Sequence, residues 1–255
     1  MNPVCTLGVI PARLASTRLP RKVLREIAGR PMLAWVYDAA LACAQLDSLV
    51  IATDSAEVAA LCRHHGWPFA MTSPDLLSGS DRVHAVSLTH PAGIYVNIQG
   101  DEPLLRPEHI GALLTPFADS SVDVTTLKVR CAADDLHNPN AVKVVLADDG
   151  RALLFSRAPI PWDRDGAIDG LPGPQSHRHA LRHIGMYAYR VRSLLRLAQL
   201  PPAALELREK LEQLRALANG MQIRVAIAAL RPGVDVNTPA DLERIRTLLE
   251  TPATS

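Results

Sequence analysis

Cysteine is scarce in this chain of 255 residues, and its four copies are scattered with no CxxC spacing. That pattern argues against a zinc site or a disulfide framework and is typical of a reducing compartment. No apolar run approaches the about 20 residues that a membrane helix needs, and residues 1–13 lack the composition of a signal peptide. We therefore expect a cytoplasmic protein with no membrane partner.

An excess of charge of one sign is also missing. The chain has 27 basic and 26 acidic residues, for a formal net charge of +1. Without a basic tail or charge block, we expect no nucleic-acid partner. Any anionic ligand has to be held by local clusters of Arg and Lys. With 48% hydrophobic residues, the chain can bury a full core.

Strand-like and helix-like segments alternate in the first half of the chain. Short apolar runs predict strands at residues 5–10, 49–53, 69–71 and 94–98, and helical spacing follows at 32–44, 56–65 and 81–89. This alternation predicts an α/β fold with a parallel sheet covered on both faces. Ligands of such sheets bind at the carboxyl ends of the strands, where the arginine-rich loop 12–25 and residues 99–101 fall.

The second half of the chain shows a different pattern of predicted strands and helices. Residues 141–147 and 152–156 flank an Asp-Gly turn, which predicts a β-hairpin. Further strands are predicted at 122–129, 185–189 and 222–228, and helices at 205–219 and 238–249. We interpret this half as an inserted hairpin and substrate lobe rather than an independent domain.

The loop after the first predicted strand concentrates positive charge at Arg13, Arg18, Arg21 and Lys22. A triphosphate needs such cations, because its charge has to be neutralised before a nucleophile attacks phosphorus. Ser16 adds a donor, but the loop lacks the glycines of a Walker A or dinucleotide-binding motif. A triphosphate site is the functional interpretation, and a solvated basic loop is the alternative.

Other polar residues allow more than one interpretation. Asp101 follows a predicted strand and is a plausible Mg²⁺ ligand, although it could equally cap a following helix. A cationic group around the proline-rich stretch could bind a carboxylate, and surface charge explains part of it equally well: Arg157, Arg164, Arg178, Arg182 and His183. Polar residues on the helix predicted over 205–219 favour a solvated face or, alternatively, contacts to a polyhydroxylated sugar: Glu206, Glu209, Glu212 and Gln213.

Short motifs along nearly the whole chain resemble one family, the 3-deoxy-manno-octulosonate cytidylyltransferases, or CMP-Kdo synthetases. They are residues 10–13 (IPAR), 16–20 (STRLP) with Lys22, 52–54 (ATD), 78–79 (SG), 97–103 (NIQGDEP), 138–145 (NPNAVKVV), 155–162 (FSRAPIPW), 182–187 (RHIGMY) and 211–215 (LEQLR).

The resemblance implies a Rossmann-like nucleotidyltransferase fold with a mostly parallel sheet and an inserted dimerisation hairpin and substrate lobe. It implies one domain over residues 1–255, with a CTP-binding half (1–122), a sugar-binding and dimerisation lobe (123–230), and a metal segment with the C-terminal helix (231–255). The implied reaction joins CTP and Kdo, with Mg²⁺, to give CMP-Kdo and diphosphate for lipopolysaccharide assembly. The implied partners are CTP, an acidic sugar and a second copy of the chain.

The resemblance also implies roles for individual residues. The catalytic set is Arg13, Lys22 and Asp101. Nucleotide binding is implied for Pro11, Ala12, Arg13, Ser16, Arg18, Lys22, Ser78, Gly79, Arg82 and Gln99. Sugar binding is implied for Gln99, Arg157, His183, Tyr187, Glu212 and Gln213. Asp101 binds the metal, together with Asn237 or Asp235.

The chain departs from the family pattern at the metal segment. Asn237 stands where the family carries a second metal-binding Asp, and Asp235 lies two residues away, on the same face if the segment is extended. Arg21 stands where the family prefers Gly. Two alternatives to Kdo activation therefore remain open: activation of a related acidic sugar such as 8-amino-Kdo, and a weakly catalytic nucleotide-binding relative.

Overall fold

The structure, a computed structural model, describes residues 5–14, 18–76, 78–168, 171–173, 175–230, 233 and 235–250. The chain divides into two compact units. Unit 1 comprises Met1–Gly111 and Pro232–Ser255, and unit 2 comprises Ala112–Arg231. Within the described ranges, no helix combines the length and the apolar character needed to cross a membrane. The four cysteines are free, as their spacing predicts.

Unit 1 is built on four parallel strands in the order β6-β1-β4-β5. Their bounds are β1 Thr6–Pro11, β4 Ser48–Thr53, β5 Phe69–Met71 and β6 Ile94–Asn97. Because β1 lies between β4 and β6, the chain moves to one side of β1 first and then to the other. That arrangement is a topological switch point, and its carboxyl edge is where ligands bind in open α/β sheets.

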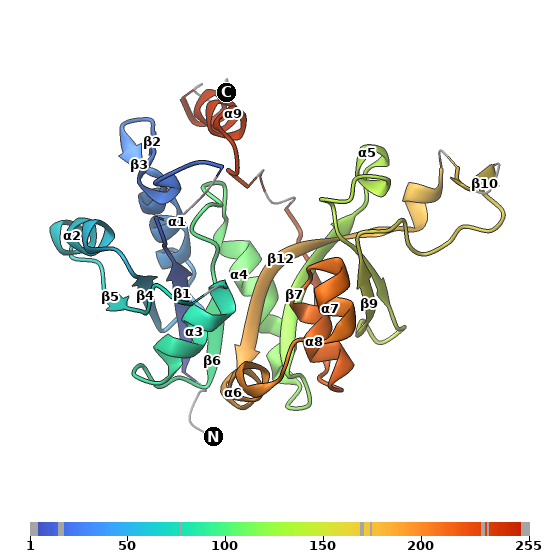
Figure 1. The fold of residues 1–255 in the computed structure, drawn as a ribbon, viewed down its shortest axis with the longest axis horizontal. Coiled ribbons are helices and arrows are strands. Elements are labelled where there is room, and N and C mark those ends of the chain that lie inside the picture. Colours follow the sequence, from blue (N-terminus) through green and yellow to red (C-terminus); the bar gives the residue numbers. More distant parts are fainter. Residues whose placement is uncertain are drawn as a thin grey trace. The chain divides into compact units, whose positions relative to one another are not determined.

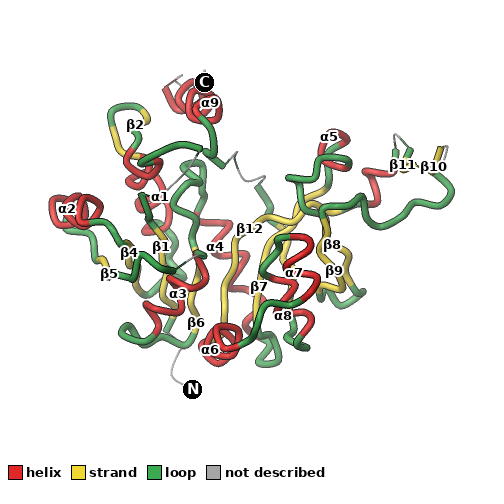
Figure 2. Tube along the Cα trace, in the orientation of Figure 1, coloured by secondary structure: helices red, strands yellow, loops and turns green. Residues whose placement is uncertain are grey.

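Local sequence signals set the helices of unit 1 (Figures 1 and 2). Ser55 caps the start of α2 through its side chain, and Gly66 ends the helix in a left-handed conformation with φ of 68°. The helices are α1 Met32–Leu41, α2 Ala56–His65, α3 Gly79–Ser87, the first part of α4 Pro107–Leu114, and α9 Pro239–Glu250; the short elements are η1 Lys22–Leu24, β2 Glu26–Ile27 and β3 Arg30–Pro31.

Unit 2 has mixed strand pairing. β13 pairs parallel with β7, while β7–β12, β12–β8 and β8–β9 are antiparallel. The strands are β7 Val124–Arg130, β8 Lys143–Leu146, β9 Ala152–Ser156, β12 Leu181–Arg190 and β13 Ile223–Ile227, with a small hairpin of β10 Ala167–Ile168 and β11 Leu171–Pro172. The helices are η2 Thr115–Ala118, α5 Ala133–Leu136, η3 Ser176–His179, α6 Val191–Gln199, α7 Ala204–Glu209 and α8 Gln213–Ala218.

The α/β class, the parallel sheet of the first half and the hairpin of the second half are confirmed. The continuous helix predicted over 205–219 is wrong. It is two helices, α7 and α8, because Lys210 adopts a left-handed backbone with φ of 54°. Helix α6 was not predicted. The interpretation of residues 1–255 as one domain stays a prediction.

Candidate active site

The ends of β1 and β6 approach each other closely in unit 1. A Cβ atom on Gly100 would lie 2.7 Å from the backbone oxygen of Pro11, so only glycine fits without moving the backbone. The hydroxyl of Thr53 donates to the Ala12 oxygen over 2.6 Å, and the Ala12 N–H donates to Ala52. The chain is therefore fixed up to Ala12, and the arginine-rich loop departs at Arg13, which is exposed.

Lys22, Asp101 and Asn237 come together from three distant parts of the sequence. The Lys22 ammonium forms an ion pair with the Asp101 carboxylate and lies 3.4 Å from the Asn237 side-chain oxygen. Arg18 donates to the same amide oxygen over 3.3 Å. The backbone N–H of Val236 donates to the backbone oxygen of Asp101 over 3.0 Å, which ties the two segments together. The structure thus gathers the predicted catalytic Lys22 and Asp101 with the predicted ligand Asn237.

The start of α9 holds Asn237 in place. The Asp241 carboxylate accepts hydrogen bonds from the backbone N–H groups of Asn237 and Thr238 and from the Thr238 hydroxyl, at 2.8–3.0 Å. Burial by itself would raise the pKa of Asp241, but these hydrogen bonds outweigh it and lower the pKa. Asp241 is therefore a charged cap that orders the segment carrying Asn237.

Further carboxylates surround Asp101. Burial, together with the neighbouring charges of Asp235 and Asp101, raises the pKa of Glu102 well above its ordinary value. Asp235 is exposed. The Asp101 carboxylate bonds to Lys22, and the next helix, α4, begins only at Pro107, so the alternative that Asp101 caps a following helix is wrong.

The oxygen atoms of this cluster fit a magnesium ion. The Asp101 carboxylate and the Asn237 amide oxygen converge on one cation, the Lys22 ammonium. Mg²⁺ takes oxygen ligands of both kinds and fills its other positions with water and phosphate oxygens. In the described part of the chain, no group of three or more His, Cys, Asp or Glu side chains forms a metal cage. Such a cage is not required where substrate phosphates complete the coordination.

Two residues around α3 that are predicted to contact nucleotide, Ser78 and Arg82, make hydrogen bonds to their neighbours. Ser78 caps α3 and forms a reciprocal capping box with Asp81. Arg82 is buried and commits its guanidinium to Asp54 and to the Thr72 hydroxyl, both at 2.6 Å. These contacts hold the ends of β4 and β5 against α3. A direct contact of Arg82 with nucleotide stays a prediction.

Gly79 and Asn97 lie beside each other in this region. A Cβ on Gly79 would lie 3.3 Å from the Asn97 amide nitrogen. Asn97 is buried, and its side-chain oxygen has no hydrogen-bond partner within the described residues. Asn97 was not in the predicted site set, although it stands in the quoted motif of residues 97–103.

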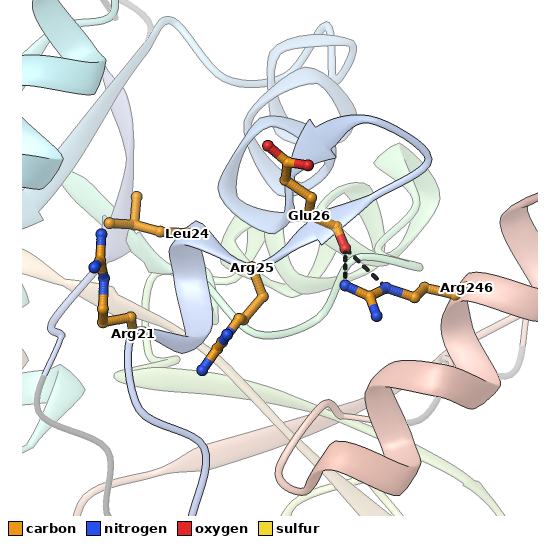
Figure 3. Close-up of a pocket in the computed structure, with 5 residues that line it drawn as sticks. All are labelled: Arg21, Leu24, Arg25, Glu26 and Arg246. Atoms are coloured by element: carbon orange, nitrogen blue, oxygen red, sulfur yellow. Dashed lines mark hydrogen bonds between the residues drawn. The ribbon is translucent and has the colours of Figure 1, made fainter.

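The arginine-rich loop borders a cavity of about 450 Å³ (Figure 3). Arg246 of α9 donates twice to the backbone oxygen of Glu26, which fastens the helix to β2. Arg21 adopts a left-handed backbone with φ of 57°, at the position where glycine would be unstrained. Ser16 lies outside the described residues. The cavity is lined by Arg21, Leu24, Arg25, Glu26 and Arg246.

Unit 2 gathers the predicted sugar-binding residues His183 and Tyr187 on β12. The His183 ring packs edge-on against Phe155 at 4.9 Å and lies 5.5 Å from the Tyr187 ring. Burial and the nearby Arg182 lower the pKa of His183 to about 3. Burial, then Tyr189 and Glu212, raise the pKa of Tyr187 well above its ordinary value. Glu212 therefore lies close to this aromatic group, and both ring side chains are neutral near pH 7.

Arg157 and Glu209 form a fixed contact in unit 2. The Glu209 carboxylate accepts from the Ser156 hydroxyl at 2.6 Å and from the Arg157 N–H at 3.0 Å. The Arg157 guanidinium donates to the backbone oxygens of Glu209 and Pro139, both at 2.7 Å. Glu206 is buried against Arg215. A solvated face for Glu206 and Glu209 is therefore wrong.

The predicted residues fall into two groups. Unit 1 contains Pro11, Ala12, Arg13, Arg18, Lys22, Ser78, Gly79, Arg82, Gln99, Asp101, Asp235 and Asn237; unit 2 contains Arg157, His183, Tyr187, Glu212 and Gln213. Besides Asn97, the residues of these clusters for which the sequence predicts no role in the site are Asp54, Glu102 and Thr126. Asp54 and Glu102 stand inside quoted motifs, which was an available signal, whereas Thr126 had none.

Comparison with known proteins gives the family. A family model described as cytidylyltransferase matches residues 7–223. The 3-deoxy-manno-octulosonate cytidylyltransferase of Acidobacterium capsulatum is 55% identical over 251 residues, covering 98% of each chain. That of Koribacter versatilis is 49% identical over 246 residues, covering 96% of this chain and 90% of the relative.

Comparison with solved structures leads to the same family. A CMP:2-keto-3-deoxy-manno-octonic acid synthetase complexed with CTP matches with a TM-score of 0.89 and 39% identity, over 96% of this chain and 98% of that one. A 4-diphosphocytidyl-2C-methyl-D-erythritol synthase from Anaerococcus prevotii, 11% identical with a TM-score of 0.63 over 97% and 99% of the two chains, shares the fold alone. The chain belongs to the 3-deoxy-manno-octulosonate cytidylyltransferase family.

Proposed function

We propose that this chain transfers CMP from CTP to Kdo and releases diphosphate. The observation that carries the proposal is the meeting of Lys22, Asp101 and Asn237 at the carboxyl edge of the unit 1 sheet, in a chain whose relatives are named for this reaction. The anomeric hydroxyl oxygen of the sugar forms a bond to the α-phosphorus. The bond from that phosphorus to the bridging oxygen breaks, diphosphate leaves, and the hydroxyl proton passes to water.

The residues of unit 1 bind and orient the triphosphate in this proposal. Lys22 and Arg18 supply positive charge beside the phosphates, and Arg13 adds to it from the start of the loop. Asp101 and Asn237 hold Mg²⁺. When bound, the ion neutralises phosphate oxygens and lowers the pKa of a coordinated oxygen. Arg13 and Arg18 are both exposed, so their positive charge can offset the part of the triphosphate charge that Lys22 and Mg²⁺ do not neutralise.

The residues of unit 2 bind the sugar acid. Tyr187 and Glu212 provide a donor and an acceptor for hydroxyl groups, and Gln213 provides both. The Arg157 guanidinium, held by the Glu209 and Pro139 carbonyls, provides positive charge for the carboxylate. His183 is neutral and serves as a hydrogen-bond partner.

Diphosphate release tests the proposal directly. Purified protein is given CTP, Mg²⁺ and one sugar acid at a time from a panel that contains Kdo and 8-amino-Kdo. We expect Kdo to give the highest kcat/KM, with no release from UTP or without sugar. A clear preference for 8-amino-Kdo would favour the related-sugar alternative instead.

Asn237 motivates the alternative of a weakly catalytic relative, because an amide oxygen is a weaker ligand for Mg²⁺ than a carboxylate. We expect Asn237→Asp to lower the Mg²⁺ concentration for half-maximal rate by about tenfold, since a carboxylate adds charge at the ion. Asp235→Asn is the matched control. Inactivity of both the natural protein and Asn237→Asp with every sugar would favour the binding-only function.

A homodimer is part of the proposal. Leu153 and Leu154 on β9 and the following Trp162 are large apolar side chains with exposed fractions of 54%, 37% and 53%. Such a group on the inserted hairpin suits a second copy of the chain. Light scattering should give twice the chain mass, and Leu153→Glu should give the mass of one chain.

The setting we propose is lipopolysaccharide synthesis in the cytoplasm, which suits four free cysteines.

A further inference from the structure

Thr126 of β7 lies at the centre of a group of hydrogen bonds beside His183. Its hydroxyl oxygen lies 2.8 Å from the His183 Nε2 atom, 3.1 Å from the Ile184 backbone oxygen and 2.8 Å from the Met186 backbone oxygen. Thr126 is fully buried, with an exposed fraction of 0%. Water therefore does not compete for these contacts.

The number of protons in this group decides the state of the His183 ring. A threonine hydroxyl has one proton, and a backbone carbonyl oxygen only accepts. The two carbonyl oxygens of Ile184 and Met186 face the hydroxyl, so its proton goes to one of them. Oγ1 keeps two lone pairs. The Thr126 side chain also hydrogen-bonds the Tyr187 hydroxyl, which can donate to one of them, and the other faces Nε2, so a stable contact of 2.8 Å requires that Nε2 carries a hydrogen.

The same threonine anchors an irregularity of β12. Ile184 pairs with Leu127 and Tyr187 pairs with Thr126, so two residues of β12 lie between neighbouring positions of β7. The carbonyls that Thr126 binds lie on both sides of Gly185, within this bulge. Bulges redirect side chains and are common beside active sites. Thr126 thus fixes the backbone between His183 and Tyr187 as well as the ring of His183.

The surroundings of His183 keep the ring uncharged. Phe155 packs against one side of it, and both burial and Arg182 disfavour the imidazolium, so that its pKa is about 3. In a neutral imidazole with a hydrogen on Nε2, Nδ1 has a lone pair and accepts hydrogen bonds. No residue in the described part of the chain donates to Nδ1 of His183.

We propose that Thr126 is a positioning residue that holds His183 in the Nε2–H tautomer and thereby leaves Nδ1 to accept a hydrogen bond from a hydroxyl group of the sugar acid. The inference rests on the proposed function, because that function places His183 in the sugar site. It assigns His183 the part of a fixed acceptor rather than a general acid or base.

Nuclear magnetic resonance of the ring nitrogens tests the tautomer without any substrate. We expect long-range ¹H–¹⁵N spectra of the full chain to show His183 with a protonated Nε2 and an unprotonated Nδ1, unchanged from pH 5.5 to 8.5. Thr126→Ser keeps the hydroxyl and should keep this signature. Thr126→Val removes the acceptor and should shift the population toward the Nδ1–H form. An Nδ1–H tautomer or an imidazolium in the natural protein overturns the proposal.

Kinetics test the link to the sugar. Thr126→Val should raise the KM for Kdo about tenfold and leave the KM for CTP within about twofold, because one hydrogen bond to the sugar is lost. Thr126→Ser should stay near the natural value. Thermal melting checks that both variants are folded. A loss that is equal for Kdo and CTP, or that Thr126→Ser shares in full, indicates a structural role only and overturns the proposal.

The spectroscopic and the kinetic experiments also separate this inference from the proposed function. If the natural protein turns over no sugar acid, the proposed function fails, while the ring spectra of the natural protein and the two variants still decide the role of Thr126. If Kdo is turned over and the ring of Thr126→Val keeps the Nε2–H form, the proposed function stands and the inference fails.

Discussion

The candidate site of unit 1 matches charge with charge, whereas that of unit 2 buries neutral groups. Lys22 and Asp101 are partly exposed, with 14% and 23% of their side chains accessible, and they form an ion pair. His183 and Tyr187 are instead held in the uncharged forms by burial. A polyphosphate is bound through charge-assisted hydrogen bonds from cationic side chains, while a sugar is oriented by a few fixed donors and acceptors.

Asp101→Asn should have the largest effect, because it removes the negative partner of the Lys22–Asp101 ion pair in unit 1. The substitution keeps the shape of the side chain but removes the negative charge that faces Lys22 and that we propose holds Mg²⁺. We expect kcat to fall by about 100-fold or more, measured as diphosphate release at saturating CTP and Kdo. Asp235→Asn, at an exposed neighbour, is the matched control and should cost far less. Equal losses in the two variants would contradict the central position of Asp101.

Among the described residues, each unit has an Arg–carboxylate pair with little exposure, and removing one charge from each pair compares the stability of the two units. Arg82 and Asp54 of unit 1 are 2% and 13% exposed, and Arg215 and Glu206 of unit 2 are 17% and 11% exposed. Asp54→Asn leaves the more deeply buried guanidinium without its counter-charge, so we expect a loss of about 3 kcal/mol. Glu206→Gln should cost about 2 kcal/mol. Urea unfolding at pH 7 measures both, and the reverse order would contradict this ranking.

His183 makes the neutral site of unit 2 sensitive to acid. The folded pKa of about 3 lies below the reference value of 6.5, so between these values the unfolded chain binds more protons. The free energy of unfolding therefore falls as the pH falls through this window. From pH 7 to pH 5 the contribution of His183 should shrink by about 2 kcal/mol.

The measurement compares urea unfolding of the natural protein and His183→Asn at the two pH values. Other groups titrate in both proteins, so the difference between the two pH slopes isolates His183. Identical slopes would show that His183 is not held neutral by the fold.

Most of the fold of unit 1 could be predicted from the sequence, because its signals are local. Ser55 and Gly66 mark the ends of α2, which begins and ends where the sequence predicts. The predicted sheet brings the loop with Lys22 and Asp101 to one edge, whereas Asn237 could be added only through the resemblance, since it lies 215 positions from Lys22. The structure adds that Asn237, rather than the exposed Asp235, reaches the Lys22 ammonium.

In unit 2 the sequence prediction failed where a distant contact decides the backbone. Residues 205–219 have good helix formers throughout, so propensity predicts one helix. At the break, Ser156 at the end of β9 and the following Arg157 bind the carboxylate and the backbone oxygen of Glu209, the last residue of α7. The role of Thr126 could not be predicted for the same reason, because its hydrogen bonds join residues that are 57 or more positions apart on two strands. Neither contact leaves a periodic or spaced pattern in the sequence.

The smallest effects should come from relieving backbone strain at one residue of each unit, Lys210 and Arg21. Lys210 ends α7 with φ of 54°, and Arg21 precedes η1 with φ of 57°. A left-handed backbone is costly for a residue with a Cβ and free for glycine, so Lys210→Gly should raise the free energy of unfolding by about 1 kcal/mol. Arg21→Gly should gain less, because it also removes an exposed ion pair with Glu57, worth about 0.5 kcal/mol. Urea unfolding measures both gains. A loss of stability in Lys210→Gly would show that the Lys210 side chain contributes more than its backbone costs.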